Sequence, residues 1–265
     1  MSKKVSASEP LRSPNQYIVD IIAQRKAPSI GIYDYRVKPI TALIREWGGA
    51  ALVDIFPSGS SAKGTALKGN SDLDIFISMS SQTNASVKEI YNSLYKALSK
   101  KFVVRKQNVS MRIVYYGLQI DIVPGKKIFG QPHFHYLYPN RRPEQERIQT
   151  NINAHVNTVV NSGRINEIIA LKIWRQLNKL DFPSMYLELF TISALNGKWS
   201  GKSYLAGNFI HTLQEIADHL HSKGLVDPAN SSNRISGSLY QYQLTEIRNA
   251  ASRAVNKTYL SQIIY

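Results

Sequence analysis

The chain has 265 residues, 43% of them hydrophobic, and carries a formal net charge of +15. It contains no cysteine, which excludes disulfides, thiolate zinc sites and cysteine nucleophiles. No apolar run approaches the ~20 residues that span a bilayer, and the first residues lack a signal-peptide pattern, so we expect a globular cytoplasmic protein without a membrane partner. The positive charge favours nucleotides, RNA or DNA as partners, although a solvated basic surface gives the same pattern.

The predicted elements separate a mixed first half of the chain from a helical second half. In the first half we expect helices over residues 15–25, 39–47 and 84–100 and strands over residues 51–56, 72–78, 102–105, 109–116 and 118–123. The last two strands meet at Gly117, which predicts an antiparallel hairpin. In the second half we expect helices over about residues 143–160, 165–177, 184–195, 205–221 and 240–255. The sequence therefore predicts an α+β lobe over residues 1–140, opening with a loose polar leader over residues 1–14, and a helical lobe over residues 141–265.

Three aspartates have the pattern of a metal site built on neighbouring strands. Asp72 and Asp74 are two residues apart on a predicted strand, so both carboxylates project from one face and the apolar residues between them face the core. Asp121 occupies the polar face of a second strand, LQIDIVPG. If the two strands are neighbours, like charges converge and need a cation between them. Oxygen donors select a hard divalent ion, so we predict two Mg²⁺ or Mn²⁺ ions, ~3.5–4 Å apart, at Asp72, Asp74 and Asp121.

A loop of small residues precedes the aspartates. Gly59, Ser60 and Ser61 let backbone N–H groups approach phosphates closely, and the two hydroxyls can also donate hydrogen bonds. Lys63 and Lys68 add positive charge at the edges of the loop. The loop, the aspartate pair and the third carboxylate together predict a site for nucleotide phosphates.

The segment GSSAKGTALKGNSDLDIFIS, residues 59–78, resembles the DNA polymerase β-type nucleotidyltransferase superfamily, in which a Gly-Ser pair precedes D-x-D on a strand. Within it, the segment is most similar to the 2′-5′ oligoadenylate synthetases and the bacterial cGAS/DncV-like nucleotidyltransferases (CD-NTases) of anti-phage defence. The likeness continues in IIALKIWRQL, FPSMYLELFTISAL and GLVDPANSSNRIS. The resemblance implies a palm-like mixed β-sheet with flanking helices, and a helical C-terminal lobe that completes the nucleotide site.

The resemblance also implies roles for three later residues. It implies that Lys172 contacts the triphosphate and that Ser184 and Asp227 bind the nucleotide. Each also has a simpler explanation from the sequence alone. Lys172 can extend from its helix to solvent, Ser184 can cap a helix, and Asp227 with the following proline forms a turn.

Two further patterns concern charged or metal-binding side chains. Glu188 is expected to fix a loop or to pair with a basic residue. His133 and His135 have the H-x-H spacing of metal ligands. Because no third ligand is apparent, an exposed basic edge strand is the simpler explanation.

The resemblance implies a template-independent nucleotidyltransferase that uses nucleoside triphosphates, ATP among them, with two Mg²⁺. Its implied product is a cyclic or linear oligonucleotide second messenger, and its implied role is in anti-phage defence. An RNA-end nucleotidyltransferase is the enzymatic alternative, and a catalytically inactive nucleic-acid-binding module is the alternative from another class. The basic segment from Lys96 to Lys106 is our predicted surface for RNA or DNA.

Overall fold

The computed structural model describes residues 13–69, 72–141 and 144–265, so the predicted leader lies almost wholly outside the described residues. The helices are α1 (Pro14–Arg25), α2 (Lys38–Gly48), α3 (Gly59–Ala62), α4 (Val87–Ser99), α5 (Ile152–Val160), α6 (Ile165–Leu177), α7 (Ser184–Ala194), α8 (Leu205–His219) and α9 (Gln241–Val255). The strands are β1 (Leu52–Ser58), β2 (Leu73–Met79), β3 (Val104–Lys106), β4 (Met111–Tyr115), β5 (Leu118–Ile128), β6 (Gln131–Leu137), β7 (Ile148–Thr150), β8 (Val226–Asp227) and β9 (Asn230–Arg234). None of the helices in the described residues is both long and apolar enough to cross a bilayer.

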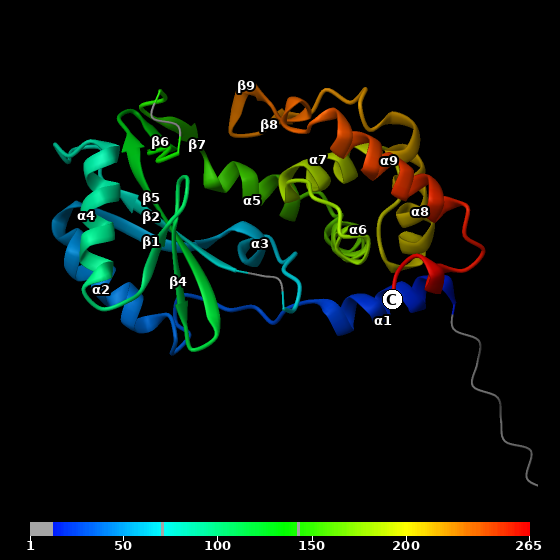
Figure 1. The fold of residues 1–265 in the computed structure, drawn as a ribbon, viewed down its shortest axis with the longest axis horizontal. Coiled ribbons are helices and arrows are strands. Elements are labelled where there is room, and N and C mark those ends of the chain that lie inside the picture. Colours follow the sequence, from blue (N-terminus) through cyan, green and yellow to red (C-terminus); the bar gives the residue numbers. More distant parts are fainter. Residues whose placement is uncertain (1–12, 70–71, 142–143) are drawn as a thin grey trace, which may run out of the picture.

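A mixed sheet forms one side of the molecule, and a group of helices forms the other (Figure 1). The strand order is β1-β2-β5-β4-β3, with β6 paired to β5 and β7 paired to β6. Strands β2 and β5 run parallel, and the other neighbouring pairs run antiparallel. Strand β5 is long enough to pair with β4 along its first half and with β6 along its second half. The predicted α+β fold with a palm-like mixed sheet and a helical C-terminal part is confirmed.

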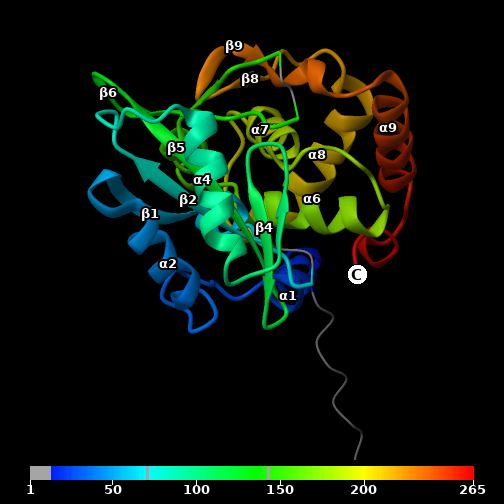
Figure 2. The same cartoon turned by 60° about the vertical axis from the view of Figure 1, so that its left-hand side comes forward.

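Helices α2 and α4 cover one face of the sheet, as the view in Figure 2 shows. The central strands alternate, so that Ile75 and Ile77 of β2 and Ile120 and Ile122 of β5 are buried beneath these helices. The polar positions of the same strands, Asp74 among them, therefore project from the opposite face. This alternation fixes the register of β2, because a slip by one residue would bury a carboxylate in the apolar layer.

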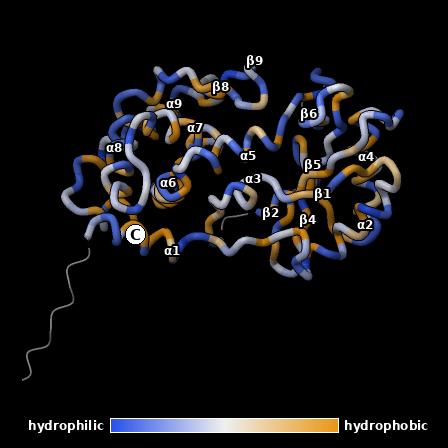
Figure 3. The backbone as a smooth tube through the Cα atoms, turned by 180° about the vertical axis from the view of Figure 1, so that it is seen from behind, coloured by the Kyte–Doolittle hydropathy of each residue, from blue (hydrophilic) through white to orange (hydrophobic). Residues whose placement is uncertain are grey.

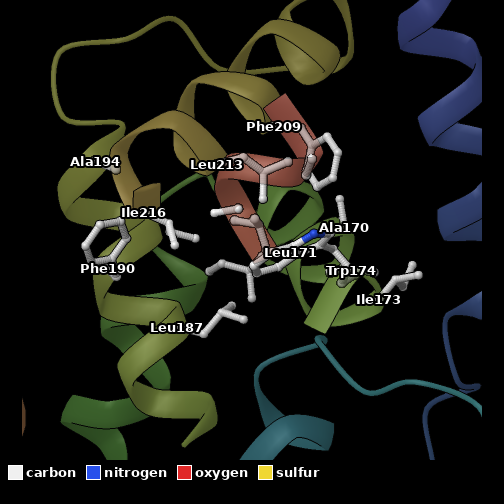
Figure 4. Close-up of a cluster of buried hydrophobic side chains, with 14 of the residues drawn as sticks. Ala170, Leu171, Ile173, Trp174, Leu187, Phe190, Ala194, Phe209, Leu213 and Ile216 are labelled. Carbon is white, nitrogen blue, oxygen red and sulfur yellow. The ribbon is translucent and has the colours of Figure 1, made fainter. Parts of the chain in front are cut away.

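The helical part has an apolar core of its own, which follows the inner faces of α6, α7 and α8 (Figures 3 and 4). Trp174, Phe190 and Phe209 are almost fully buried in it, and each contributes roughly 1.5–3 kcal/mol by leaving water. Helix α1 also packs here, through Ile18 and its buried neighbours. The predicted division at residue 140 remains a prediction, but the packing departs from it because α1 joins the core of the helices rather than that of the sheet.

Three segments differ from the expected elements. The single helix predicted over residues 143–160 is instead strand β7 followed by α5, and α5 begins after Asn151, whose side chain accepts a hydrogen bond of 3.0 Å from the Ala154 N–H. Strand β6 is paired on both sides at His135, which is buried, so the prediction of an exposed edge strand is wrong there, whereas His133 is exposed as expected. The hairpin of β8 and β9 was not expected, because the sequence NSSNR has no apolar alternation.

Candidate active site

The turn from β1 into α3 depends on a glycine. Gly59 has a φ of +58°, in the left-handed region, and a Cβ added there would lie 1.8 Å from Oδ2 of Asp74. Only a residue without a side chain lets the loop pass this close to the carboxylate. The predicted small-residue loop and the D-x-D strand are therefore in direct contact.

The three aspartates come together on β2 and β5. In the parallel ladder, Asp74 lies opposite Asp121, and Asp72 immediately precedes β2. Burial, together with the charges of Asp121 and Asp72, raises the pKa of Asp74 to about 6. Burial also raises the pKa of Asp72, despite the nearby guanidinium of Arg112. The site therefore concentrates negative charge at a cost to the ionised forms, as a site prepared for cations does.

Arg112 on β4 already neutralises part of this charge. Its Nε and Nη2 donate to the two carboxylate oxygens of Asp121, both at 2.8 Å, and Nη2 also donates to Oδ2 of Asp72. Its Nη1 donates to Oε1 of Gln119 at 3.0 Å. These pairings raise the pKa of Arg112, with Asp121 as the main cause. Sequence reasoning missed Arg112, although its place opposite Asp121 in the β4–β5 hairpin was within reach of the predicted strand pairing.

The donor set suits a hard divalent ion, because three carboxylates supply only oxygen ligands. Their present arrangement is not that of a formed metal site. Among the described residues, no group of three or more histidine, cysteine, aspartate or glutamate side chains is placed to hold an ion. Two of the three carboxylates are bound to the guanidinium instead. Asp72, Asp74 and Asp121 can therefore serve a metal once Arg112 withdraws.

A polar cavity of about 410 Å³ adjoins the loop after Gly59. Ser60 and Thr65 line it from the side of the sheet, and Lys172, Arg175 and Ser184 line it from α6 and α7. Hydroxyls and cations on facing walls are the groups that bind phosphates. Because Ser60 directly follows Gly59, which contacts Asp74, the cavity lies next to the carboxylates.

A buried ionic cluster fixes the wall of this cavity. Lys172 Nζ donates to Oε1 of Glu188 at 2.7 Å and to the hydroxyl of Thr65 at 2.8 Å, and Lys63 Nζ donates to Oε2 of Glu188 at 2.7 Å. Burial lowers the pKa of Lys172, while its pairing with Glu188 opposes the shift. The expectation that Glu188 pairs with a basic residue is confirmed. Lys172 lines the cavity, whereas Lys63 is directed to Glu188 and does not.

The other predicted residues divide between the cavity and the scaffold. Ser184 is the first residue of α7 and not its N-cap, so the capping role is wrong; its hydroxyl accepts a hydrogen bond of 3.1 Å from Arg175 Nη2. Ser61 lies on the far side of the loop, against a different cavity of about 270 Å³. Arg175 was missed by sequence reasoning. The sequence pattern that could have identified Arg175 is its spacing, because it follows Lys172 by three residues and so lies on the same face of the helix.

Asp227 is occupied within its own hairpin. Its Oδ1 lies 2.7 Å from Nε2 of His155 and accepts from the Ala229 N–H, and its Oδ2 accepts from the side chain of Asn233 at 3.0 Å. Although burial opposes it, these hydrogen bonds lower the pKa of Asp227. The structure therefore uses Asp227 to tie the β8–β9 hairpin to α5, and it does not line the cavity beside Ser60.

Comparison with known proteins agrees with this architecture. Residues 39–129 match the nucleotidyltransferase domain family, and no match was found among curated protein sequences. CdnC of E. coli MS115-1, solved in complex with HORMA-deltaN, is similar at 20% identity, with a TM-score of 0.68 and coverage of 91% of this chain and 89% of that chain. The Bradyrhizobium diazoefficiens CD-NTase CdnG, in complex with GTP, has a TM-score of 0.75 at 13% identity, covering 94% of this chain and 92% of that chain. The Cid1 poly(U) polymerase, solved bound to MgATP, has a TM-score of 0.64 at 13% identity, covering 92% and 95%.

The domain match indicates a nucleotidyltransferase domain over residues 39–129. The fold of the whole chain is similar to that of CdnC and to that of CdnG, which is a CD-NTase.

Proposed function

We propose that this enzyme joins nucleoside triphosphates without a template and makes a cyclic or linear oligonucleotide messenger that serves anti-phage defence. The observation that carries the proposal is the contact between two halves of a site. The carboxylates of β2 and β5 meet the loop at Gly59, and the next residue of that loop lines a cavity. The lining of this cavity also holds three cations and one carboxylate: Lys172, Arg175, Lys179 and Asp181. ATP and GTP are the first candidate substrates, because solved relatives were obtained with them.

In this proposal the chain's own residues divide the work. Ser60, Lys172 and Arg175 bind the triphosphate in the cavity and hold it in place. Asp72, Asp74 and Asp121 hold two divalent ions, Mg²⁺ or Mn²⁺, which when bound supply the positive charge that activates the acceptor hydroxyl and stabilises the leaving oxygen. The acceptor oxygen gives its proton to solvent water and bonds to the α-phosphorus. The bond from that phosphorus to the bridging oxygen breaks, and pyrophosphate leaves with its electron pair.

Product analysis tests the proposal. The purified protein is incubated with the four nucleoside triphosphates and Mg²⁺, with and without a short RNA, and the products are identified by mass. We expect short oligonucleotides from triphosphates alone, and cyclic products that survive alkaline phosphatase because they have no terminal phosphate. Products that form only on the end of added RNA would contradict the messenger and establish an RNA-end nucleotidyltransferase. No pyrophosphate under either condition would leave the nucleic-acid-binding alternative.

We also propose that RNA or DNA binds outside the catalytic site, on the basic segment from Lys96 to Lys106. Lys100, Lys101 and Arg105 are all exposed, at the end of α4 and on the edge strand β3. For contacts to Z phosphates, the logarithm of the binding constant falls with the logarithm of salt concentration at a slope of about −0.7Z to −0.9Z. Replacing these three cations by alanine should flatten the slope and leave turnover of free triphosphates unchanged. If wild-type protein at micromolar concentration binds no duplex RNA at low salt, these cations are solvated and form no RNA-binding surface.

A further inference from the structure

A second cavity, of about 680 Å³, is lined by the second half of β5, strand β6, the beginning of α4 and residues 145–147. Figure 2 shows where these elements lie in the fold. A cavity of this volume is in the range of small-molecule sites. None of the three aspartates lines it, nor do Ser60 and Lys172.

The lining of this cavity is strongly basic. Lys88, Lys126, Lys127 and Arg147 contribute cations, whereas Glu146 contributes the one carboxylate in the lining. In the described part of the chain, the four cations form no ion pair within 4.0 Å. Uncompensated cations converging on one concave surface attract an anion.

Lys126 shows that one of these cations is held in place. Its Nζ donates to the carbonyl oxygens of Thr83 and Ala85, at 2.7 and 3.0 Å. These carbonyls fix its position without neutralising its charge, and they use two of the three donors of the ammonium. The loop before α4 is thereby attached to β5 on the cavity wall.

Aromatic side chains lie beside the cations in this cavity, and they distinguish a nucleotide from a simple anion as the ligand. The guanidinium of Arg147 lies over the ring of Tyr136, 4.3 Å from its centroid. Phe129, on the turn between β5 and β6, lines the cavity with 79% of its surface exposed. Inorganic phosphate would use the cations but not the rings. A planar base stacks on exposed rings and on guanidinium groups, so the two features together fit a nucleotide.

The cavity and the catalytic site share strand β5. Asp74 lies opposite Asp121, and five residues further along the same ladder Met79 lies opposite Lys126. At about 3.3 Å per residue the two places are about 16 Å apart. A molecule bound beside Lys126 is therefore separate from one bound beside Ser60, and it contacts the strand that carries Asp121.

We propose that this cavity is a second nucleotide-binding site, in which Lys127 and Arg147 bind phosphate and Tyr136 and Phe129 receive the base. The ligand is a phosphorylated nucleoside, either a triphosphate or an oligonucleotide of the kind the enzyme makes. Nucleotide binding in this cavity does not require turnover, so it can be tested separately from the proposed reaction.

Calorimetric titration of the whole chain tests the site. The probes are non-hydrolysable α,β-methylene analogues of ATP and GTP, a linear diadenylate and inorganic phosphate, each in buffer with Mg²⁺. We expect the wild-type chain to bind one more molecule of at least one nucleotide probe than a Lys127→Ala, Arg147→Ala double variant does, since the catalytic site contributes equally to both counts. The matched control removes two cations elsewhere, as Lys100→Ala with Lys101→Ala, and should keep the wild-type count. The triphosphate and diadenylate arms distinguish substrate from product as the ligand.

A milder variant keeps the test decisive if the double variant is unstable. Phe129→Ala alters an exposed ring on a turn, so it should fold, and the loss of one stacking partner should weaken the second site about 5- to 150-fold. Photo-crosslinking with an azido-adenosine triphosphate should label the peptide of β6 in wild type. Equal nucleotide counts in wild type and the double variant would overturn the proposal. So would equally tight binding of inorganic phosphate, or variants that lose duplex RNA binding but keep all nucleotide binding.

Discussion

Gly59 is the residue at which the two halves of the active site meet, so its replacement by alanine perturbs them together. The new Cβ would lie 1.8 Å from Oδ2 of Asp74, whereas ordinary contact begins near 3.4 Å. The carboxylate or the loop must therefore move by about 1.5 Å, and a displacement of ~1 Å in a catalytic group costs about 100-fold in rate. The left-handed φ of +58° adds about 1–2 kcal/mol of strain for any residue with a side chain.

We therefore expect Gly59→Ala to lower the rate of pyrophosphate release by at least about 100-fold and the free energy of unfolding by about 1–2 kcal/mol. A coupled phosphate assay measures the first quantity, and urea denaturation measures the second.

A matched control separates strain from displacement. Gly197 also has a left-handed φ, +74°, but a Cβ there meets no atom within 4 Å. Gly197→Ala should lose similar stability and keep normal turnover. If Gly59→Ala retains more than about a tenth of wild-type turnover, the geometry argued for Asp74 and the loop is wrong.

Three other perturbations follow from the same contacts. Asp74→Asn should abolish pyrophosphate release while leaving the melting temperature equal or higher, since burial and neighbouring carboxylates disfavour the charge of Asp74. Asp121→Asn should also abolish pyrophosphate release, but it should lower the melting temperature because Arg112 loses its partner. Arg112→Gln should tighten Mn²⁺ binding about 10- to 100-fold, because the ion no longer competes with a charged hydrogen bond worth ~1.5–3 kcal/mol. The electron paramagnetic resonance of free Mn²⁺ measures this affinity, and an unchanged affinity would show that the guanidinium does not obstruct the ion. Burial lowers the pKa of His135 to about 4, so between about pH 6.5 and 4 the imidazole is protonated in the unfolded chain but not in the folded one. As the pH falls through this window, wild type should lose up to about 3 kcal/mol of its free energy of unfolding, and His135→Gln should not show this loss.

The depressed pKa of His135 has a structural cause that the H-x-H pattern concealed. Nε2 lies 2.8 Å from the hydroxyl of Ser78, whereas Nδ1 has no partner among the described residues. The imidazolium would need acceptors at both nitrogens. Spacing alone suggested an exposed ligand pair, but pairing of β6 on both edges placed His135 inside the molecule.

Much of the fold was predictable because its patterns are local. The hairpin at Gly117 needs a left-handed turn, and both Tyr116 and Gly117 have positive φ. The amphipathic spacing in α4 predicted its buried face, and the alternation in β2 and β5 predicted which side the aspartates take. The convergence of Asp74 and Asp121 required only one long-range assumption, that the two strands are neighbours.

The remaining features depend on contacts between distant segments. No local pattern shows that Lys63 turns to Glu188, because the two residues meet only when α3 packs against α7. The same holds for Asp227, whose motif suggested a ligand while His155 of α5 occupies one of its oxygens. Buried charges must find partners, yet the sequence does not reveal which of several opposite charges becomes the partner.

Arg112 shows how one register serves two opposed requirements. The parallel pairing of β2 with β5 brings Asp74 opposite Asp121, and the antiparallel pairing of β4 with β5 brings Arg112 opposite Asp121 from the other side. Three converging carboxylates without a cation would destabilise the sheet, and the guanidinium offsets that repulsion within the chain itself. The same pairing makes any divalent ion compete with Arg112 for the oxygens of Asp121 and Asp72. An ion that arrives together with a triphosphate brings additional ligands, so nucleotide and metal should bind with positive cooperativity. In Arg112→Gln, this cooperativity should remain, because the phosphates still bind the ion, but Mn²⁺ should bind more tightly than to wild type both with and without the α,β-methylene analogue. Wild-type affinities in both titrations would refute the competition.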